Sequence, residues 1–225
     1  MGEMLKTEDV TSLGYHLTSI QCRFYFIKMK FPSWIKGAEA LSKMVRQAVF
    51  IDRDGTLGGT DRVVLPGEFE LYPKVKDSIQ SLRAAGMLIC SFTNQPGIAR
   101  GEATMGEFES ELSAFGFDKI YLCAHEHGAG CQCRKPSAGM LLKAAEDNNL
   151  DLAKCYVIGD RWTDMVAANE AGCKKALVMT GAGAKELEKY NNHEYFGKWK
   201  DAYPDFIATD LNEAVTWILG GGEVR

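Results

Sequence analysis

Four groups of polar residues in this chain each follow a short apolar run, and together they hold the side chains for chemistry on a phosphate. The groups are Asp52-Arg53-Asp54-Gly55-Thr56, Thr93-Asn94, Arg134-Lys135-Pro136, and Gly159-Asp160 with Asp164. Carboxylates are ligands that Mg²⁺ prefers, and a hydroxyl and a lysine can hold anionic oxygens. Because distant segments deliver these groups at equivalent positions, we expect them to form one site.

The first group has an ordinary alternative, since Asp-Gly pairs are common in turns. The buried strand expected before Asp52 favours the catalytic interpretation. Two carboxylates two positions apart, Asp52 and Asp54, can share a site if one Mg²⁺ screens their repulsion. The side chains of Asp52 and Asp160, with the backbone carbonyl of Asp54, are sufficient protein ligands for that ion.

From residue 48 onward, short apolar runs alternate with longer amphipathic segments, a pattern typical of strands joined by crossover helices. The expected strands are 48–52, 87–92, 119–123, 155–158, 175–179 and 206–208. The expected helices are 75–83, 105–115, 140–146, 165–171 and 211–219. The sequence thus predicts an α/β fold, a doubly wound, Rossmann-like parallel sheet with helices on both faces. Ligands bind at the carboxyl edge of such sheets, where all four polar groups are expected.

The four groups, in this order, resemble the motifs of the haloacid dehalogenase-like hydrolases, and the resemblance covers about Met44 to Leu219. Three segments resemble the branch that contains heptose 1,7-bisphosphate phosphatases and histidinol-phosphate phosphatases. They are Asp52-Arg53-Asp54-Gly55-Thr56, Thr93-Asn94-Gln95-Pro96-Gly97-Ile98-Ala99-Arg100-Gly101 and Cys131-Gln132-Cys133-Arg134-Lys135-Pro136. One such motif occurs easily by chance, whereas the ordered set is very specific.

The resemblance implies a phosphatase in which Asp52 attacks phosphorus and forms an aspartyl-phosphate intermediate. Asp54 would protonate the leaving oxygen and then activate water. Thr93 and Lys135 would hold the phosphoryl oxygens.

The last group would complete the metal site. Asp160 would bind Mg²⁺, and Asp164 would support Lys135 or the waters of the metal. Asp164 has the alternative of capping the following helix, and both roles can coexist.

A cluster of cysteines and histidine precedes Arg134, and it is sufficient for a closed tetrahedral zinc site. Its members are Cys123, His125, Cys131 and Cys133, with His127 as a spare candidate. The alternative is that these cysteines are simply buried in the core, as apolar side chains are. The family resemblance adds to the zinc interpretation, because the same branch carries a structural zinc loop before its Arg-Lys-Pro. We expect a structural ion that fixes Arg134 and Lys135.

Charge and composition limit the classes of partner that we expect for this protein. The formal net charge is −4, from 26 Lys and Arg against 30 Asp and Glu, which gives no long-range attraction for nucleic acid. The apolar stretch from Ile20 to Trp34 contains three charged residues and is too short and too interrupted for a membrane span. An odd number of cysteines and no visible signal peptide favour a cytoplasmic protein. We expect a monomer or weak homo-oligomer.

The chain is expected to divide into an N-terminal arm, residues 1–43, and a phosphatase domain, residues 44–225. The aromatic content of the arm favours packing on the domain, with an interface role as the alternative. We expect the arm to be dispensable for chemistry.

The expected substrate is a small phosphorylated metabolite, with a sugar bisphosphate such as heptose 1,7-bisphosphate favoured. Neither gap between the motifs is long enough for a large cap domain, so the site should be open, and Arg134 and Asn94 would contact substrate. The alternatives are a histidinol-phosphate phosphatase, a polynucleotide 3′-phosphatase, phosphoryl transfer to another sugar, and a zinc-stabilised binding protein without turnover.

Overall fold

The structure is a computed structural model that describes residues 47–223. The expected arm, residues 1–43, and the expected start of the domain at Met44 lie outside the described residues. The helices are α2 (Val75–Ala84), α3 (Met105–Phe115), α4 (Gly139–Asn148), α5 (Trp162–Ala171), α6 (Gly183–Asn191), α7 (Lys198–Asp201) and α8 (Leu211–Leu219). In the described part of the chain no helix is long and apolar enough to cross a membrane.

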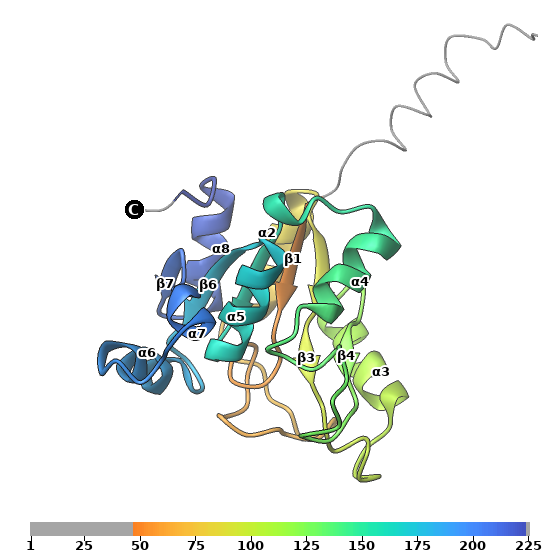
Figure 1. Ribbon diagram of the computed structural model, residues 1–225. Coiled ribbons are helices and arrows are strands. Elements are labelled where there is room, and N and C mark those ends of the chain that lie inside the picture. The colour runs from red at the N-terminus through yellow and green to blue at the C-terminus, as the bar shows by residue number, and fades with distance from the viewer. Residues whose placement is uncertain (1–46, 224–225) are drawn as a thin grey trace, which may run out of the picture. The chain divides into compact units, whose positions relative to one another are not determined.

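A parallel sheet of five strands forms the centre of the domain (Figure 1). The strands are β1 (Ala48–Ile51), β2 (Leu88–Ser91), β5 (Tyr156–Gly159), β6 (Lys174–Val178) and β7 (Phe206–Ala208). Their order across the sheet is β2-β1-β5-β6-β7, and each neighbouring pair is parallel. The chain leaves β1 toward one side for β2 and returns to its other side for β5. The predicted doubly wound parallel fold is confirmed.

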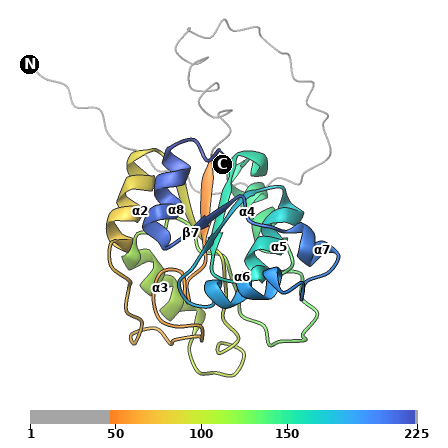
Figure 2. The same ribbon diagram turned by 90° about the vertical axis from the view of Figure 1, so that its left-hand side faces the viewer.

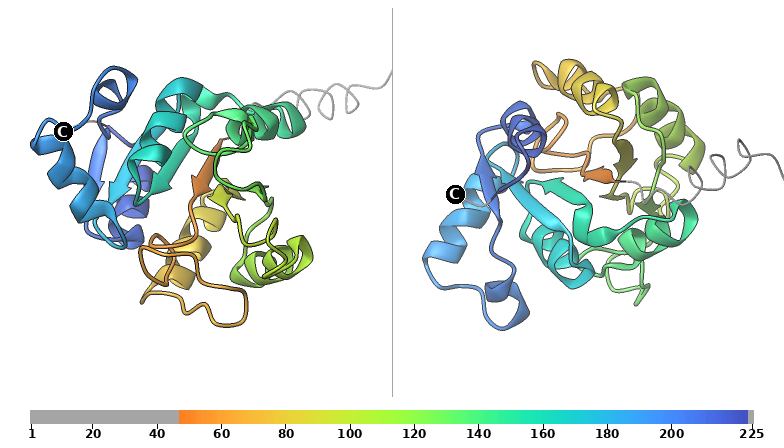
Figure 3. Two further views of the ribbon diagram at one scale, coloured as in Figure 1. Left: turned by 60° about the horizontal axis from the view of Figure 1, so that its bottom comes forward. Right: turned by 90° about the horizontal axis from the view of Figure 1, so that it is seen from above.

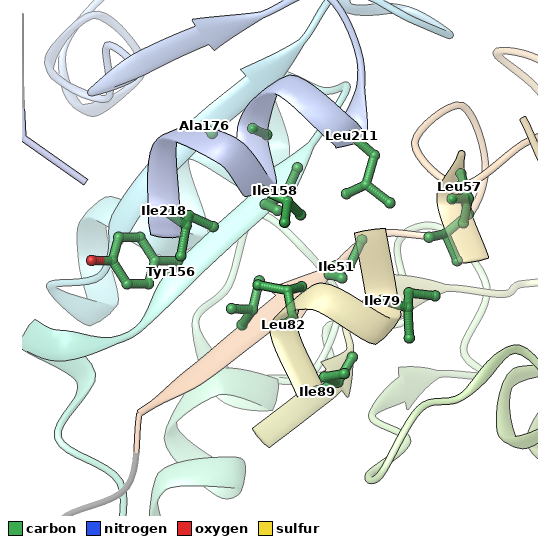
Figure 4. Packing of buried hydrophobic residues seen from close by; sticks show 14 of the residues in the cluster. Ile51, Leu57, Ile79, Leu82, Ile89, Tyr156, Ile158, Ala176, Leu211 and Ile218 are labelled. Carbon is green, nitrogen blue, oxygen red and sulfur yellow. The ribbon is translucent and has the colours of Figure 1, made fainter. Parts of the chain in front are cut away.

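Helices cover both faces of the sheet. Figure 2 shows α2 and α8 next to each other, with α4 and α5 across the sheet from them, and the view from above in Figure 3 shows the same separation. Successive residues of a strand point to opposite faces, so alternate positions enter different cores. In β1, Val49 and Ile51 pack with α2 and α8, whereas Ala48 and Phe50 pack with α4 and α5. Figure 4 shows Ile51 and Ile158 facing Leu82 of α2 and Ile218 of α8.

A second, small sheet extends beyond β2. It pairs β3 (Thr93–Asn94) with β4 (Leu122–Cys123) in parallel. The strand predicted over 119–123 is therefore shorter than expected, and Lys119 makes an isolated bridge to Cys90. The small sheet matters for the site because its backbone hydrogen bonds bring Thr93 and Cys123 close together.

Two differences from the sequence prediction lie after β5. The helix predicted from Met165 begins at Trp162, because the Asp164 carboxylate accepts a hydrogen bond from the Arg161 backbone N–H (3.0 Å) and closes the first turn early. The region between β6 and β7, for which no element was expected, contains α6 and α7. Because α6 is mostly polar, the sequence pattern did not reveal its short buried side, which includes Gly183 and Glu186.

Two adjacent leucines of α4 provide a test of the packing. Leu141 is fully buried in the core shared with α5, and Leu142 is 56% exposed. Leu141→Ala should lower the free energy of unfolding by about 2–5 kcal/mol, because it deletes buried methyl groups and leaves a cavity. Leu142→Ala should change it by less than about 0.5 kcal/mol. Chemical denaturation of both variants checks this, and equal losses would contradict the assigned face of α4.

Candidate active site

The four polar groups of the sequence converge at the carboxyl edge of the sheet. Asp52 follows β1, and its backbone N–H donates to Ile158 O of β5 (3.0 Å). Asp160 follows β5, Thr93 comes just after β2, and Lys135 lies in the loop after β4. The edge between β1 and β5 is the point where the strand order reverses, and such switch points form ligand crevices in doubly wound sheets.

Lys135 is the central cation of the site. Its ammonium Nζ lies 2.8 Å from Asp52 Oδ1 and 2.6 Å from Asp164 Oδ1, and it donates to Phe92 O at 2.8 Å. The side chain is almost completely buried. Burial lowers the pKa of Lys135, but the carboxylates of Asp164 and Asp52 outweigh it and the net shift is upward. Lys135 is therefore a charged ammonium group held at the end of β1.

Three buried carboxylates, those of Asp52, Asp160 and Asp164, lie together and fit a divalent cation. They offer oxygens that all lie within 4.8 Å of one another. Lys135 offsets one of their three charges, and Asp160 Oδ1 is buried without a hydrogen-bond partner. Burial first, and then the charge of Asp52, raise the pKa of Asp160 to about 8. A hard cation with oxygen ligands would balance this excess charge, so the residues fit the expected Mg²⁺.

The geometry refines the metal ligands expected from the sequence. Asp164, which was expected to support Lys135 or the waters of the metal, contributes a carboxylate to the same group as Asp52 and Asp160. It also makes the helix-capping hydrogen bond to Arg161, so both roles weighed for Asp164 coexist in the structure.

Asp54 directs its carboxylate to other partners. Its Oδ1 accepts from Arg53 Nη1 (2.8 Å) and from the Val64 N–H (2.9 Å), and its Oδ2 accepts from Gln95 Nε2 (2.7 Å). Burial raises the pKa of Asp54, with Arg53 acting in the opposite sense. A carboxyl whose pKa is raised is suited to holding and releasing a proton. The backbone carbonyl of Asp54 as a metal ligand stays a prediction.

Arg53 and Gln95 are site residues to which the sequence analysis gave no role. Arg53 is fully buried, forms an ion pair with Glu111 of α3 (2.6 Å) and lies 3.8 Å from the centre of the Phe69 ring. Gln95 donates to Thr93 Oγ1 (2.9 Å) as well as to Asp54. The only sequence signal for either was membership of a motif, since Arg53 meets Glu111 and Gln95 meets Asp54 from distant parts of the chain.

A cavity of about 710 Å³ opens over these groups. Asp52, Asp54, Thr93, Asn94, Arg134 and Lys135 all line it, so the structure brings the predicted catalytic and substrate-binding side chains together. Asn94 also pairs with the Lys135 backbone, accepting from its N–H (3.1 Å). Arg134 donates to His125 O (3.2 Å). Both residues thus connect the cavity to the loop that carries Lys135.

The cysteine and histidine cluster forms a compact group beside the cavity. Cys123 Sγ lies 3.6 Å from both Cys131 Sγ and His125 Nδ1, and Cys133 Sγ lies 3.2 Å from His125 Nδ1. Bonds of about 2.3 Å to sulfur and about 2.0 Å to nitrogen in a tetrahedron place the ligand atoms roughly 3.5–3.8 Å apart. The four residues therefore fit a zinc ion. His127 lines the catalytic cavity and is not part of this group.

Close approach of backbone to Asp160 requires glycine at position 55. Gly55 has a φ of 82°, and a Cβ there would lie 2.2 Å from Asp160 Oδ2. The loop after β1 can therefore pass over the Asp160 carboxylate only without a side chain at this position.

Comparison with known families and proteins agrees with this geometry. A family model described as haloacid dehalogenase-like hydrolase matches residues 60–172, and a model described as HAD-hydrolase-like matches residues 132–214.

Two curated relatives are heptose bisphosphate phosphatases. D-glycero-D-manno-heptose-1,7-bisphosphate 7-phosphatase of Thermosynechococcus vestitus is 34% identical over 196 residues, which cover 78% of this chain and 96% of that protein. D-glycero-beta-D-manno-heptose-1,7-bisphosphate 7-phosphatase of Haemophilus ducreyi is 38% identical over 156 residues, 61% of this chain and 86% of that protein.

A solved structure shares the fold. D,D-heptose 1,7-bisphosphate phosphatase from B. bronchiseptica, complexed with magnesium and phosphate, has a TM-score of 0.67 and is 30% identical. The match covers 78% of this chain and 99% of that one.

The buried carboxylates predict how stability depends on pH in metal-free protein. Because folding raises the pKa of Asp160 from 3.8 to about 8, its stabilising contribution is complete below 3.8 and is lost as the pH rises toward 8. In the presence of a chelator the melting temperature should fall over this range, and Mg²⁺ should raise it most at the alkaline end. Asp160→Asn should flatten the dependence. Thermal melts at a series of pH values check this, and equal slopes in both proteins would contradict it.

Proposed function

This chain is a phosphatase of the haloacid dehalogenase-like hydrolase family, and we propose that it hydrolyses a phosphorylated sugar, with a bisphosphate such as heptose 1,7-bisphosphate as the preferred substrate. The observation that carries the proposal is the convergence of Asp52, Asp54, Thr93 and Lys135 on one cavity, beside a group of carboxylates that fits Mg²⁺. Each of these side chains has a role in phosphoryl transfer.

Asp52 is the proposed nucleophile. One of its oxygens attacks phosphorus as the bond to the sugar oxygen breaks, which forms an aspartyl phosphate on Asp52, and water then attacks that intermediate and releases phosphate. Lys135, 2.8 Å from Asp52 Oδ1, orients the carboxylate and offsets the negative charge of the transferring group. Mg²⁺, held by Asp52, Asp160 and the Asp54 carbonyl with Asp164 in support, would supply further charge neutralisation at the phosphoryl oxygens.

Asp54 is the proposed general acid and base. Its contacts with Arg53, Gln95 and the Val64 N–H hold the carboxyl in one orientation, and burial favours its protonated form. In the first step it gives a proton to the departing sugar oxygen, and in the second it takes one from water. Thr93, whose hydroxyl oxygen accepts from Gln95, is placed to donate its proton to a phosphoryl oxygen.

Arginines at the cavity support a substrate with a second anionic group. Arg62, Arg134 and Arg161 line the cavity in addition to Lys135. Guanidinium groups bind phosphate bidentately, so this lining favours a bisphosphate. It disfavours histidinol phosphate, whose amine would meet like charge. The net charge of −4 disfavours the end of a nucleic acid.

We further propose that Cys123, His125, Cys131 and Cys133 hold a structural Zn²⁺. Four protein ligands leave no open position for chemistry. The zinc would act by holding the loop that carries Arg134 and Lys135, since Arg134 already contacts His125 O.

The proposed activity is tested by measuring phosphate release with and without Mg²⁺ from sugar monophosphates, sugar bisphosphates, histidinol phosphate and 3′-phosphorylated oligonucleotides. A sugar bisphosphate should give the highest kcat/KM. Asp52→Asn should abolish release, and Asp54→Asn should lower kcat by about 10²- to 10⁴-fold while substrate binding is retained. Metal-dependent phosphate release from histidinol phosphate alone, or from the oligonucleotides alone, would contradict the proposed substrate. A folded wild type that releases no phosphate from any compound in the panel would contradict the proposed activity.

The zinc proposal predicts one equivalent of zinc in the purified protein. Cys131→Ala should lose it and unfold at lower temperature, because a tetrahedral site needs all four ligands. Cys173→Ala is the matched control, since Cys173 is a buried cysteine outside the cluster, and it should retain the metal. Elemental analysis and thermal melts check both variants. Zinc retained in Cys131→Ala at the wild-type level would exclude the cluster as its site.

A further inference from the structure

The segment between β6 and β7, residues 179–205, carries aromatic side chains that meet the start of α5. Two of them, Tyr195 and Trp199 of α7, together with Trp162 of α5, are called here the aromatic stack. The Tyr195 ring lies between the other two, 5.0 Å from Trp162 and 5.8 Å from Trp199 by ring centres, with interplanar angles of 21° in both cases. Offset stacking of this kind holds aromatic rings in a defined arrangement.

Hydrogen bonds fix the aromatic stack to the start of α5. Trp162 Nε1 donates to the backbone oxygen of Trp199 (2.5 Å). The buried carboxylate of Glu186 accepts from the Trp162 N–H (3.1 Å) and from the Tyr195 hydroxyl (2.6 Å). A helix of four residues such as α7 would be poorly held by its own backbone, so these contacts determine where Trp199 lies.

The same segment is tied directly to the proposed metal site. Trp162 is the second residue after Asp160, and it is fully buried. At the beginning of the segment the Ala182 N–H donates to Asp160 Oδ2 (2.7 Å), and Thr180 Oγ1 donates to Gly55 O (2.6 Å). The position of Trp199 is thereby set relative to the catalytic carboxylates. Figure 2 shows α7 lying beside α5.

Trp199 reaches the catalytic cavity. It lines the cavity together with Asp52, Asp54 and Lys135, and among its described lining residues it is the only tryptophan, tyrosine or phenylalanine. Trp199 is half-buried, so the part of the ring that Tyr195 leaves uncovered is available to a ligand. Most of the side chains that line the cavity are charged or polar, and Trp199 adds a large apolar side chain to them.

We propose that Trp199 is a specificity-determining residue whose ring packs against the carbon–hydrogen face of the sugar that carries the phosphate. This inference rests on the proposed function and adds a recognition element for the organic part of the substrate. The phosphoryl group is held by the residues at the end of β1, and Trp199 would distinguish leaving groups with an apolar face from those without one. Glu186 and Tyr195 are positioning residues for this contact.

The test compares a sugar substrate with acetyl phosphate, whose small leaving group cannot reach far along the cavity. Trp199→Ala should raise KM for the preferred sugar phosphate by about tenfold, with little change in kcat, and should leave both parameters for acetyl phosphate near wild type. Trp199→Phe should recover part of the loss, because it keeps a ring next to Tyr195. Phe196→Ala is the matched control, as Phe196 is 75% exposed on the same segment and does not line the cavity.

A binding measurement gives a second readout. The dephosphorylated sugar should quench tryptophan fluorescence in the wild type and not in Trp199→Phe. Equal losses on the sugar phosphate and acetyl phosphate, or an unchanged KM for the sugar phosphate in Trp199→Ala, would overturn the inference. Failure of the proposed function is seen separately, as a wild type that hydrolyses acetyl phosphate but no sugar phosphate.

Discussion

The buried ammonium of Lys135 is the constraint on which the site depends. Its Nζ lies within 2.8 Å of the carboxylate of Asp52, which follows β1, and of that of Asp164, in the first turn of α5, and Lys135 itself comes from a third segment. A charge buried this completely is tolerated only with partners, and Lys135 in turn offsets part of the negative charge of the carboxylates around it. The loops at the carboxyl edge are therefore mutually dependent: β1, β5 and the loop after β4 must each be in place before the charges balance. The proposed zinc ion at the cysteine and histidine cluster would add a further restraint on the same loop.

The sequence predicted the parallel sheet and the convergence of the site because both rest on strong local signals. Apolar runs such as Ala48 to Ile51 leave little choice but a buried strand, and in a parallel sheet every strand ends at the same edge. Once their strands were assigned, Asp52, Thr93 and Asp160 could be predicted to lie close together. The ordered motifs then supported one another, which no single Asp-Gly pair could do.

The rest of the site depends on contacts that sequence spacing does not reveal. Arg53 contacts Glu111, which lies 58 positions away, and Gln95 contacts Asp54 from 41 positions away. The early start of α5 arises from one capping carboxylate, Asp164, which also serves Lys135. The segment with α6 and α7 has a polar sequence, and its structure is held by contacts of aromatic rings and of Glu186. Hydrophobic periodicity therefore did not predict its helices.

That segment joins β6 to β7, the last strand at one side of the sheet. A connection to an outermost strand can lengthen or shorten without threading through the core, because only one neighbour must keep its register. The proposed nucleophile, Asp52, and the proposed general acid, Asp54, by contrast, follow the central strand β1. In the proposed scheme, substrate recognition and catalysis thus occupy parts of the chain with unequal freedom to vary. Natural selection could change the sugar that such a protein accepts by changing the segment that leads to the outermost strand. The residues at the ends of the central strands, and their chemistry, could stay the same.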